Sequence, residues 1–326
     1  MGNELAYAPH SVNKVPIGNA SEAFMLRCHA QNLTDGTITW YTDLLRVWNR
    51  YLESNGVTLA KEVTPELIRS YFDDMRKRGM ASGTIARTYG ALRCFFGFLS
   101  RERMIPQNPF ALIAKPRMEK KLIKPLSMEQ ARLLLAAINK RTFQGLRLWT
   151  MVVLMLDTGL RVAEVMGLRV DEMDFQAGVL RVMGKGAKER QVPFSSVAKQ
   201  ALWNYTVRRG EIPGQDLVFV SQFGKRLERC WMRKALRCVN QRLKLQGVRL
   251  SPHTLRHTFA TQYIINGGDA FSLQEILGHS TINMVRLYVA LANRDVALMH
   301  RRFSPMERMG VVPGSRRRIM VRGGLA

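Results

Sequence analysis

GLRLWTMVVLMLDTGLRVAE, residues 145–164, holds the pattern that says most about the fold. Residues 145–157 are apolar on most faces of a helix, which predicts a helix buried inside a core. The Thr-Gly pair that follows ends this helix, because glycine interrupts regular structure. Arg161 and Glu164 come directly after that end, three residues apart. The stretch therefore predicts a buried helix, a turn and then a pair of charged side chains.

Two short strands are predicted after this stretch. GVLRVM at 178–183 and ERQVPF at 189–194 contain β-branched and apolar residues, and GKGAK at 184–188 separates them. Such runs around a Gly-Lys-rich turn are typical of a β hairpin. Helical patterns fill most of the remaining sequence, and the Ser-x-x-Gln capping box at 127–130 marks the start of one helix. We therefore expect a mainly α domain with a small β hairpin or sheet, an α+β fold, over residues 126–312.

A smaller all-α domain, a helical bundle, is predicted over residues 21–104. Apolar residues recur at helical spacing from Ile38 to Leu52. Thr64-Pro65-Glu66 is a helix start, with a hydroxyl cap, a proline in the first turn and an acid near the positive end of the helix dipole. Ser82 is expected to cap the next helix. Residues 1–20 are expected to form a flexible arm, because they mix prolines and glycines with few periodic positions.

A basic linker is predicted between the two domains, over residues 105–125. The segment 101–127 contains four prolines, seven cations and only two glutamates, which opposes regular structure and keeps the segment solvated. Its cations are Arg101, Arg103, Lys115, Arg117, Lys120, Lys121 and Lys124. A linker that contacts phosphates is the favoured interpretation, and an ordinary exposed loop is the alternative. A second basic segment, residues 313–326, forms the C-terminal tail.

The composition narrows the function classes. The 326 residues carry a formal net charge of +25, and 46% are hydrophobic, so the chain is globular and suited to a polyanion such as nucleic acid. The longest apolar stretch, residues 148–156, is too short to span a membrane, and the first residues contain no secretory signal pattern. The four cysteines contain no CxxC pair, which favours buried thiols in a reducing compartment over a metal site.

Several common catalytic motifs are incomplete or absent in this sequence. The glycines around Lys185 have the wrong spacing for a phosphate-binding Walker A loop, and no Ser or Thr follows the lysine. His253 and His257 have the spacing of two zinc ligands on a helix, but Thr254 replaces the required glutamate. No paired acidic cluster of the two-metal type is present either. We therefore expect no metal and no cofactor.

Five short motifs remain, and each alone is most simply explained by structure. They are Thr158-Gly-Leu-Arg161-Val-Ala-Glu164, Gly184-Lys185-Gly186, His253-Thr-Leu-Arg256, Leu277-Gly-His279-Ser280 and Tyr288. Together, in this order, they resemble the tyrosine recombinase (phage integrase) family. The resemblance is close over residues 126–303, and residues 21–104 are more loosely similar to the family's core-binding domain. It implies a two-domain DNA clamp that cuts and rejoins DNA through a 3′-phosphotyrosine, without metal or ATP.

The resemblance also implies a role for each matching residue. Tyr288 is the nucleophile, and Arg161 and Arg256 grip the phosphate and neutralise its growing charge. His253 is a base or hydrogen-bond acceptor, and His279 hydrogen-bonds the phosphate. Lys185 is the general acid for the leaving 5′ oxygen, with Lys188 as a nearby competitor. Glu164 orients the other site residues without contacting the DNA itself. His257 has two interpretations, a residue of the site or an ordinary helix residue.

The expected partner is double-stranded DNA carrying a specific recombination site. The residues expected to contact DNA are Lys115, Arg117, Lys120, Lys121, Lys124, Lys188 and Arg190. The resemblance implies a homotetramer or heterotetramer on DNA, with residues 290–310 passed to a neighbour, and a directionality factor is a further possible partner. The sequence after Tyr288 favours a mobile-element integrase over a chromosome resolvase. The protein is expected to act in the cytoplasm, at the nucleoid. The alternatives are a catalytically silent DNA-binding protein, a type IB topoisomerase and a basic structural or RNA-binding protein.

Overall fold

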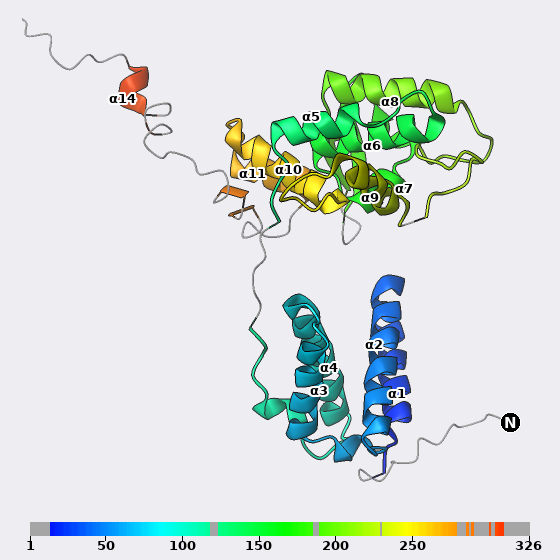
Figure 1. Ribbon diagram of the computed structural model, residues 1–326, viewed down its shortest axis with the longest axis vertical. Helices are drawn as coiled ribbons and strands as arrows, with labels where there is room; N and C mark the ends of the chain where they lie inside the picture. Colours follow the sequence, from blue (N-terminus) through cyan, green and yellow to red (C-terminus); the bar gives the residue numbers. More distant parts are fainter. Residues whose placement is uncertain are drawn as a thin grey trace, which may run out of the picture. The chain divides into compact units, whose positions relative to one another are not determined.

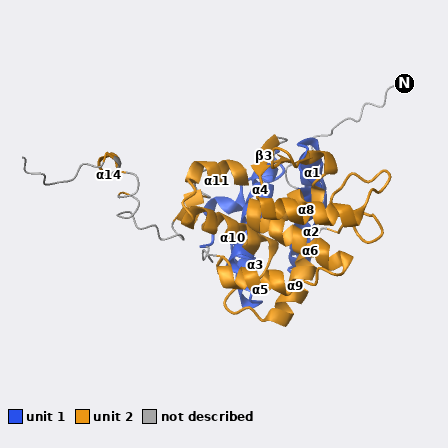
Figure 2. Ribbon diagram, turned by 90° about the horizontal axis from the view of Figure 1, so that it is seen from above, with its two compact units in different colours: residues 1–121 blue, residues 122–326 orange. Residues whose placement is uncertain are grey.

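The computed structural model describes residues 14–117, 123–184, 189–228, 230–278, 285–286, 288–289, 300 and 304–309. The chain divides into two compact units, Met1–Lys121 and Leu122–Ala326 (Figure 2). The division falls inside the segment 105–125. Each unit has its own apolar core.

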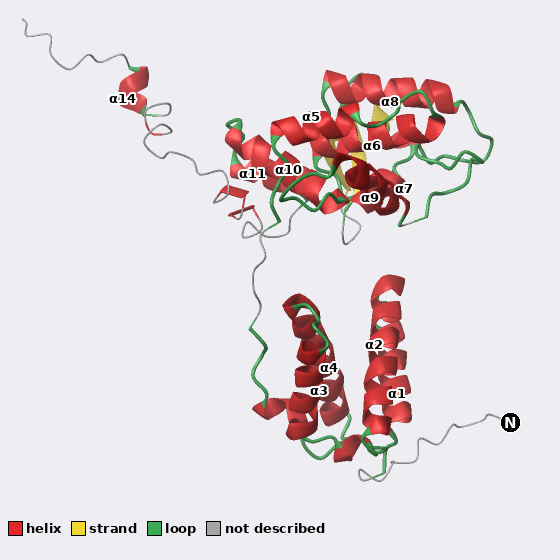
Figure 3. Ribbon diagram, viewed as in Figure 1, coloured by secondary structure: helices red, strands yellow, loops and turns green. Residues whose placement is uncertain are grey.

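The first unit consists of helices joined by loops over its described residues (Figure 3). Its elements are α1 (Ile17–Ala30), α2 (Asp35–Ser54), η1 (Ala60–Glu62), α3 (Pro65–Lys77), α4 (Ser82–Arg101) and η2 (Pro109–Leu112). Aromatic rings fill the core, where Trp48, Phe95 and Phe96 are fully buried. Edge-to-face contacts hold them, such as that of Phe24 and Phe95 with ring centroids 5.4 Å apart. Thr64 caps α3 as expected, because its hydroxyl oxygen accepts from the Leu67 backbone N–H at 3.2 Å.

Two details of the first unit differ from expectation. Helix α1 begins at Ile17, inside the expected arm 1–20, because Val15 and Ile17 are apolar and become buried. The Ile17 backbone N–H also donates to Thr58 at 2.9 Å, which holds this segment against the loop before η1. Ser82 is the first residue of α4 rather than its cap; Ala81 takes the cap position, with no side-chain hydrogen bond.

The described parts of the segment between the units contain no helix or strand at 113–117 and 123–127. Its beginning is held to the first unit, since the Tyr89 hydroxyl donates to the Ile113 carbonyl at 2.8 Å. Its end is held to the second unit, since the Leu126 N–H donates to the Thr258 hydroxyl at 2.9 Å. Lys115, Arg117 and Lys124 are exposed. Lys120 and Lys121 lie outside the described residues.

The second unit surrounds one buried helix. Its elements are α5 (Met128–Ala136), α6 (Phe143–Thr158), α7 (Val162–Gly167), η3 (Val170–Glu172), β1 (Met173–Asp174), β2 (Val179–Met183), β3 (Glu189–Pro193), α8 (Ser196–Arg209), α9 (Trp231–Leu243), α10 (Pro252–Ile265), α11 (Ala270–Leu277) and α14 (Pro305–Arg308). Helix α6 packs against α5, α7, α8 and α10 (Figure 1). Met151, Val152 and Leu154 on it are fully buried, as the apolar pattern predicted. The capping box at α5 is also present, with Ser127 and Gln130 exchanging hydrogen bonds of 3.0 and 3.1 Å.

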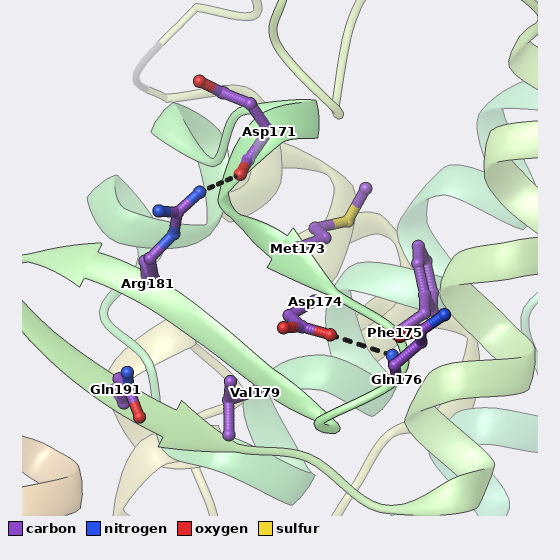
Figure 4. A pocket seen from close by; sticks show the side chains of 8 residues that line it. All are labelled: Asp171, Met173, Asp174, Phe175, Gln176, Val179, Arg181 and Gln191. Carbon is purple, nitrogen blue, oxygen red and sulfur yellow. Dashed lines mark hydrogen bonds between the residues drawn. The ribbon is translucent and has the colours of Figure 1, made fainter.

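The sheet is antiparallel with the strand order β1-β2-β3. The hairpin of β2 and β3 was expected, whereas the two-residue strand β1 was not, because so short a strand leaves no periodic pattern. Alternate residues face the core, among them Leu180 and Val182 on β2 and Val192 on β3. Arg181 and Gln191 face outward and line a hollow of mixed polar and apolar character together with Asp171, Met173, Asp174, Phe175, Gln176 and Val179 (Figure 4).

None of the helices in the described part of the chain is long and apolar enough to cross a membrane.

Candidate active site

Arg161 and Glu164 are placed by the turn that follows α6. Gly159 takes a left-handed conformation with φ 65°, and a Cβ atom there would lie 2.3 Å from Cδ1 of Phe259. Arg161 is then the N-cap of α7, and Glu164 is three residues into that helix. The Glu164 carboxylate accepts from the backbone N–H of Arg161 at 2.8 Å and from Nη1 of its guanidinium at 2.9 Å. The motif therefore folds on itself and holds both charges at one point.

Arg256 reaches the same region from α10. Its side chain is buried, with Nη1 donating to the Gly159 carbonyl at 2.7 Å and Nη2 donating to the Leu277 carbonyl at 2.8 Å. Burial, together with repulsion from Arg161, lowers the pKa of Arg256 to about 10, so this guanidinium is still protonated at neutral pH. The structure therefore brings together two arginines that are 95 residues apart in the sequence.

Both guanidinium groups converge on the C-terminal end of α11. The Leu277 carbonyl accepts from Arg256 and also from Nη1 of Arg161 at 3.4 Å, and the Gly278 carbonyl accepts from Nη2 of Arg161 at 3.5 Å. Cations are favoured at this end of a helix, where the last carbonyls carry partial negative charge. His279 follows directly in the sequence but lies outside the described residues.

Tyr288 packs beside these arginines. Its side chain is 3% exposed and belongs to an apolar cluster with Ile264 of α10 and Leu273 of α11. Burial raises the pKa of the Tyr288 hydroxyl above its ordinary value, although the positive charges of Arg256 and Arg161 act in the opposite direction. Tyr288 is therefore a protonated phenol at neutral pH that needs help to lose its proton.

The two histidines of α10 have different surroundings. His253 is exposed in the first turn of the helix. One turn later, the ring of His257 lies with its centroid 5.3 Å from that of Tyr288. Its Nδ1 atom is buried with no hydrogen-bond partner, and burial, followed by repulsion from His253 and Arg256, lowers its pKa. His257, which sequence reasoning left open, is thus a neutral imidazole packed against the tyrosine.

Arg190 takes a different place from the one expected for a DNA contact. It lies opposite Val182 in the sheet register and shares the inward face of β3 with Val192. Its side chain is only 13% exposed, and its guanidinium pairs with the Glu164 carboxylate. Strand alternation was the signal that could have indicated this, because residues two apart on a strand face the same side.

The other predicted site residues are not all described. Lys185, Lys188 and His279 lie outside the described residues, as do Lys120 and Lys121 of the linker and most of the segment 290–310. Among the residues that are described, no group of three or more His, Cys, Asp or Glu side chains could hold a metal ion.

Comparison with known proteins shows the family of the chain. Residues 124–294 match the phage integrase family, and residues 28–103 match the N-terminal SAM-like domain of phage integrases. The chain belongs to the phage integrase family. Its resemblance to the tyrosine recombinases is thereby confirmed, and this integrase-family chain is an enzyme of the tyrosine recombinase type.

Relatives match this integrase-family chain over most of its length. It is 33% identical over 280 residues to tyrosine recombinase XerD of Halalkalibacterium halodurans, covering 84% of this chain and 93% of the relative. It is 31% identical over 265 residues to tyrosine recombinase XerC of Bacillus subtilis, covering 79% of this chain and 86% of the relative.

Solved structures support the fold. The integrase of transposon Tn1549, in complex with a circular-intermediate DNA, has a TM-score of 0.72 at 21% identity and covers 91% of this chain and 100% of that one. A lambda integrase fragment in a dimer bound to a COC′ core site has a TM-score of 0.72 at 18% identity, covering 86% and 98%. The expected fold class, mainly α with a small sheet and a separate helical N-terminal domain, is confirmed.

Proposed function

We propose that this recombinase binds double-stranded DNA and cuts and rejoins it through a covalent bond between Tyr288 and a 3′ phosphate. The observation that carries the proposal is the meeting of three segments. The guanidinium groups of Arg161 and Arg256 converge on the end of α11, beside the buried ring of Tyr288. Arginine forks bind two phosphate oxygens at once, so this cluster suits a phosphodiester.

The chemistry balances without an external energy source. The Tyr288 oxygen attacks phosphorus and forms a phosphotyrosine ester, while the bond from phosphorus to the 5′ oxygen breaks. One ester replaces another, so no ATP is needed to reverse the step. Arg161 and Arg256 stabilise the charge on the phosphate oxygens, which is the work that a metal does in other phosphoryl-transfer sites.

Two protons must move in this step. The Tyr288 hydroxyl passes its proton to an imidazole on α10, either His253 or His257. Lys185 supplies a proton to the leaving 5′ oxygen, and Lys188 remains the alternative donor. His279 is proposed to hydrogen-bond the phosphate from the position that directly follows Gly278.

The DNA surface includes the exposed cations of the linker. Lys115, Arg117 and Lys124 are described and free of ion pairs in the described part of the chain, and Lys120, Lys121 and Lys188 are proposed to add to them. Phosphate contacts of this kind supply most of the affinity and make it fall steeply with salt.

Strand exchange joins two duplexes, so the proposal includes a homotetramer, or a heterotetramer with related recombinases, on a specific DNA site. Residues 290–310 are proposed to pass to a neighbouring subunit, and a directionality factor is a candidate partner. We favour integration and excision of a mobile element over chromosome resolution, because of the sequence that follows Tyr288. The protein is proposed to act at the nucleoid.

Covalent trapping tests the central proposal. The protein is incubated in EDTA with a pool of nicked duplexes from the DNA that flanks its own gene, and the mixture is then denatured. An adduct with the wild type and none with Tyr288→Phe is the expected result. An adduct with Tyr288→Phe would overturn the assignment of the nucleophile.

Two further results would favour the other candidates. Salt-sensitive DNA binding without any adduct would favour a silent DNA-binding protein of the same fold. Relaxation of supercoiled plasmid without a specific site would favour topoisomerase-like activity.

A further inference from the structure

Arg190 makes three hydrogen bonds with two segments of the active site. Its Nη1 and Nη2 donate to the two carboxylate oxygens of Glu164 at 3.1 and 3.0 Å, and its Nε donates to the Ile276 carbonyl at 3.0 Å. Strand β3 is thereby tied both to α7 and to the end of α11. Each of the three guanidinium nitrogens makes one of these bonds, which indicates a fixed orientation.

The same carboxylate orients Arg161. The Arg161 side chain is 38% exposed, whereas that of Glu164 is 9% exposed. Packing therefore restricts Glu164 much more than Arg161. The Arg161 guanidinium is oriented by its 2.9 Å bond to Glu164 and by longer bonds to the Leu277 and Gly278 carbonyls at the end of α11. A buried carboxylate without enough partners is unfavourable, so Glu164 in turn depends on Arg190.

Charge balance leads to the same conclusion. Burial by itself raises the pKa of Glu164, but hydrogen bonds from Arg190 and Arg161 and the charge of Arg190 outweigh it, so that the pKa is lowered overall. Glu164 is therefore ionised at neutral pH and lies between two arginines. Glu164, Arg161 and Arg190 together carry one net positive charge, and the neighbouring Arg256 adds a second.

The end of α11 is held in a similar way. Its last carbonyls each accept from an arginine: Ile276 from Arg190, Leu277 from Arg256 and Arg161. The Arg190 guanidinium also packs closely on the backbone, since a Cβ atom at Gly278 would lie 3.1 Å from its Cζ. A shift of Arg190 would therefore move the helix end on which the other two arginines rest.

We propose that Arg190 is a positioning residue for DNA cleavage, which fixes Arg161 through Glu164 and fixes the end of α11 through Ile276. The inference rests on the proposed function for its effect on the reaction. It gives Arg190 no contact with DNA, in contrast to the outward cations of the linker.

The first test compares two substitutions with a matched control. Arg190→Gln removes the fork, Arg190→Lys keeps the charge without it, and Arg181→Gln makes the same change on the outward face of β2. The probe is the nicked duplex recovered by covalent trapping. Adduct formation is measured in a single turnover, and binding to the same duplex is measured by fluorescence anisotropy.

Arg190→Gln is expected to slow adduct formation about 100-fold, as a displaced active site does, with the dissociation constant changed less than about 3-fold. Arg190→Lys is expected to remain at least about 10-fold slow, because an ammonium cannot make the bidentate contact. Arg181→Gln is expected to cleave like the wild type. Wild-type cleavage by Arg190→Lys, or an equal loss of binding and cleavage in Arg190→Gln, would overturn the proposal.

A second test does not require the protein to cleave DNA. In the free protein labelled with ¹⁵N-arginine, the Arg161 guanidinium signals are identified by their loss in Arg161→Lys. They are expected to be resolved in the wild type and to move toward free arginine in Arg190→Gln but not in Arg181→Gln. Unchanged Arg161 signals in Arg190→Gln would overturn the positioning role. Failure of wild-type trapping would instead count against the proposed function alone.

Discussion

The rings of His257 and Tyr288 lie 5.3 Å apart between centroids, with an angle of 56° between their planes. The imidazole is neutral and the phenol is protonated, because burial lowers the pKa of His257 and raises that of Tyr288. A neutral imidazole is a proton acceptor, and a protonated phenol is a donor. The pair therefore combines the proposed nucleophile, which is buried, with an imidazole that is uncharged at neutral pH and could accept its proton.

The lowered pKa of His257 predicts a specific pH dependence of stability. A histidine whose pKa is lower in the folded state contributes stability above its unfolded pKa near 6.5, and that stability is lost as the pH falls through the folded pKa. Wild type is therefore expected to lose stability relative to His257→Gln between pH 8 and pH 5. Urea unfolding at each pH measures the difference, and His29→Gln, at an exposed position of α1, is the control. A difference that does not change with pH would contradict the prediction.

Substitution of Arg256 and substitution of Arg161 are expected to differ in their effect on stability but not in their effect on activity. Arg256→Ala leaves the buried carbonyls of Gly159 and Leu277 without these donors, so it is expected to destabilise the protein by roughly 2–4 kcal/mol. Arg161→Ala removes a partly exposed side chain and is expected to lower stability by less than about 1 kcal/mol. Both are expected to abolish adduct formation. Chemical unfolding and covalent trapping on the same preparations check this, and equal destabilisation would argue against it.

Gly159 is expected to be irreplaceable. Its φ is 65°, and an alanine Cβ would lie 2.3 Å from Phe259 and 2.7 Å from Leu277. Gly159→Ala is expected to reduce the free energy of unfolding by roughly 3 kcal/mol, from left-handed strain and overpacking together. Gly167→Ala is the control, since no atom lies within 4 Å of its Cβ position, and it is expected to stabilise α7 by about 0.5 kcal/mol. Similar unfolding midpoints for the two variants would be the opposite result.

The linker cations predict a graded salt dependence. The slope of log affinity against log salt is negative. Each of Lys115→Gln, Arg117→Gln and Lys124→Gln is expected to make it less steep by about 0.9, the value for one lost phosphate contact on duplex DNA. Lys61→Gln, at an exposed position in η1, is expected to leave the slope unchanged. Anisotropy titrations with one duplex between about 50 and 200 mM salt measure it. An unchanged slope for all three linker variants would place the DNA surface elsewhere.

Local sequence patterns were enough to predict an element wherever contacts between residues three or four apart determine it. The capping box of Ser127 and Gln130, the Thr64 cap and the buried helix α6 are set by such short-range contacts. Ser82 shows the limit of local reasoning. It is the first residue of α4, and the N-cap position before it is taken by Ala81, which makes no capping side-chain hydrogen bond. The end of the expected arm 1–20 was wrong for another reason: Ile17 begins a helix, is buried and donates a backbone hydrogen bond to Thr58, which lies 41 residues later.

The sequence by itself determined the family, the nucleophile candidate and the two arginines, because the order and spacing of a few reactive residues are linear information. Only the tertiary structure decided which partners these residues have. Arg190 and Glu164 are 26 residues apart, and their pairing follows from which face of β3 turns toward α7. Likewise, His257 meets Tyr288 only because α10 and α11 enclose a common apolar cluster. A buried charge or ring takes its partner from the packing around it, and packing is a property of the whole domain.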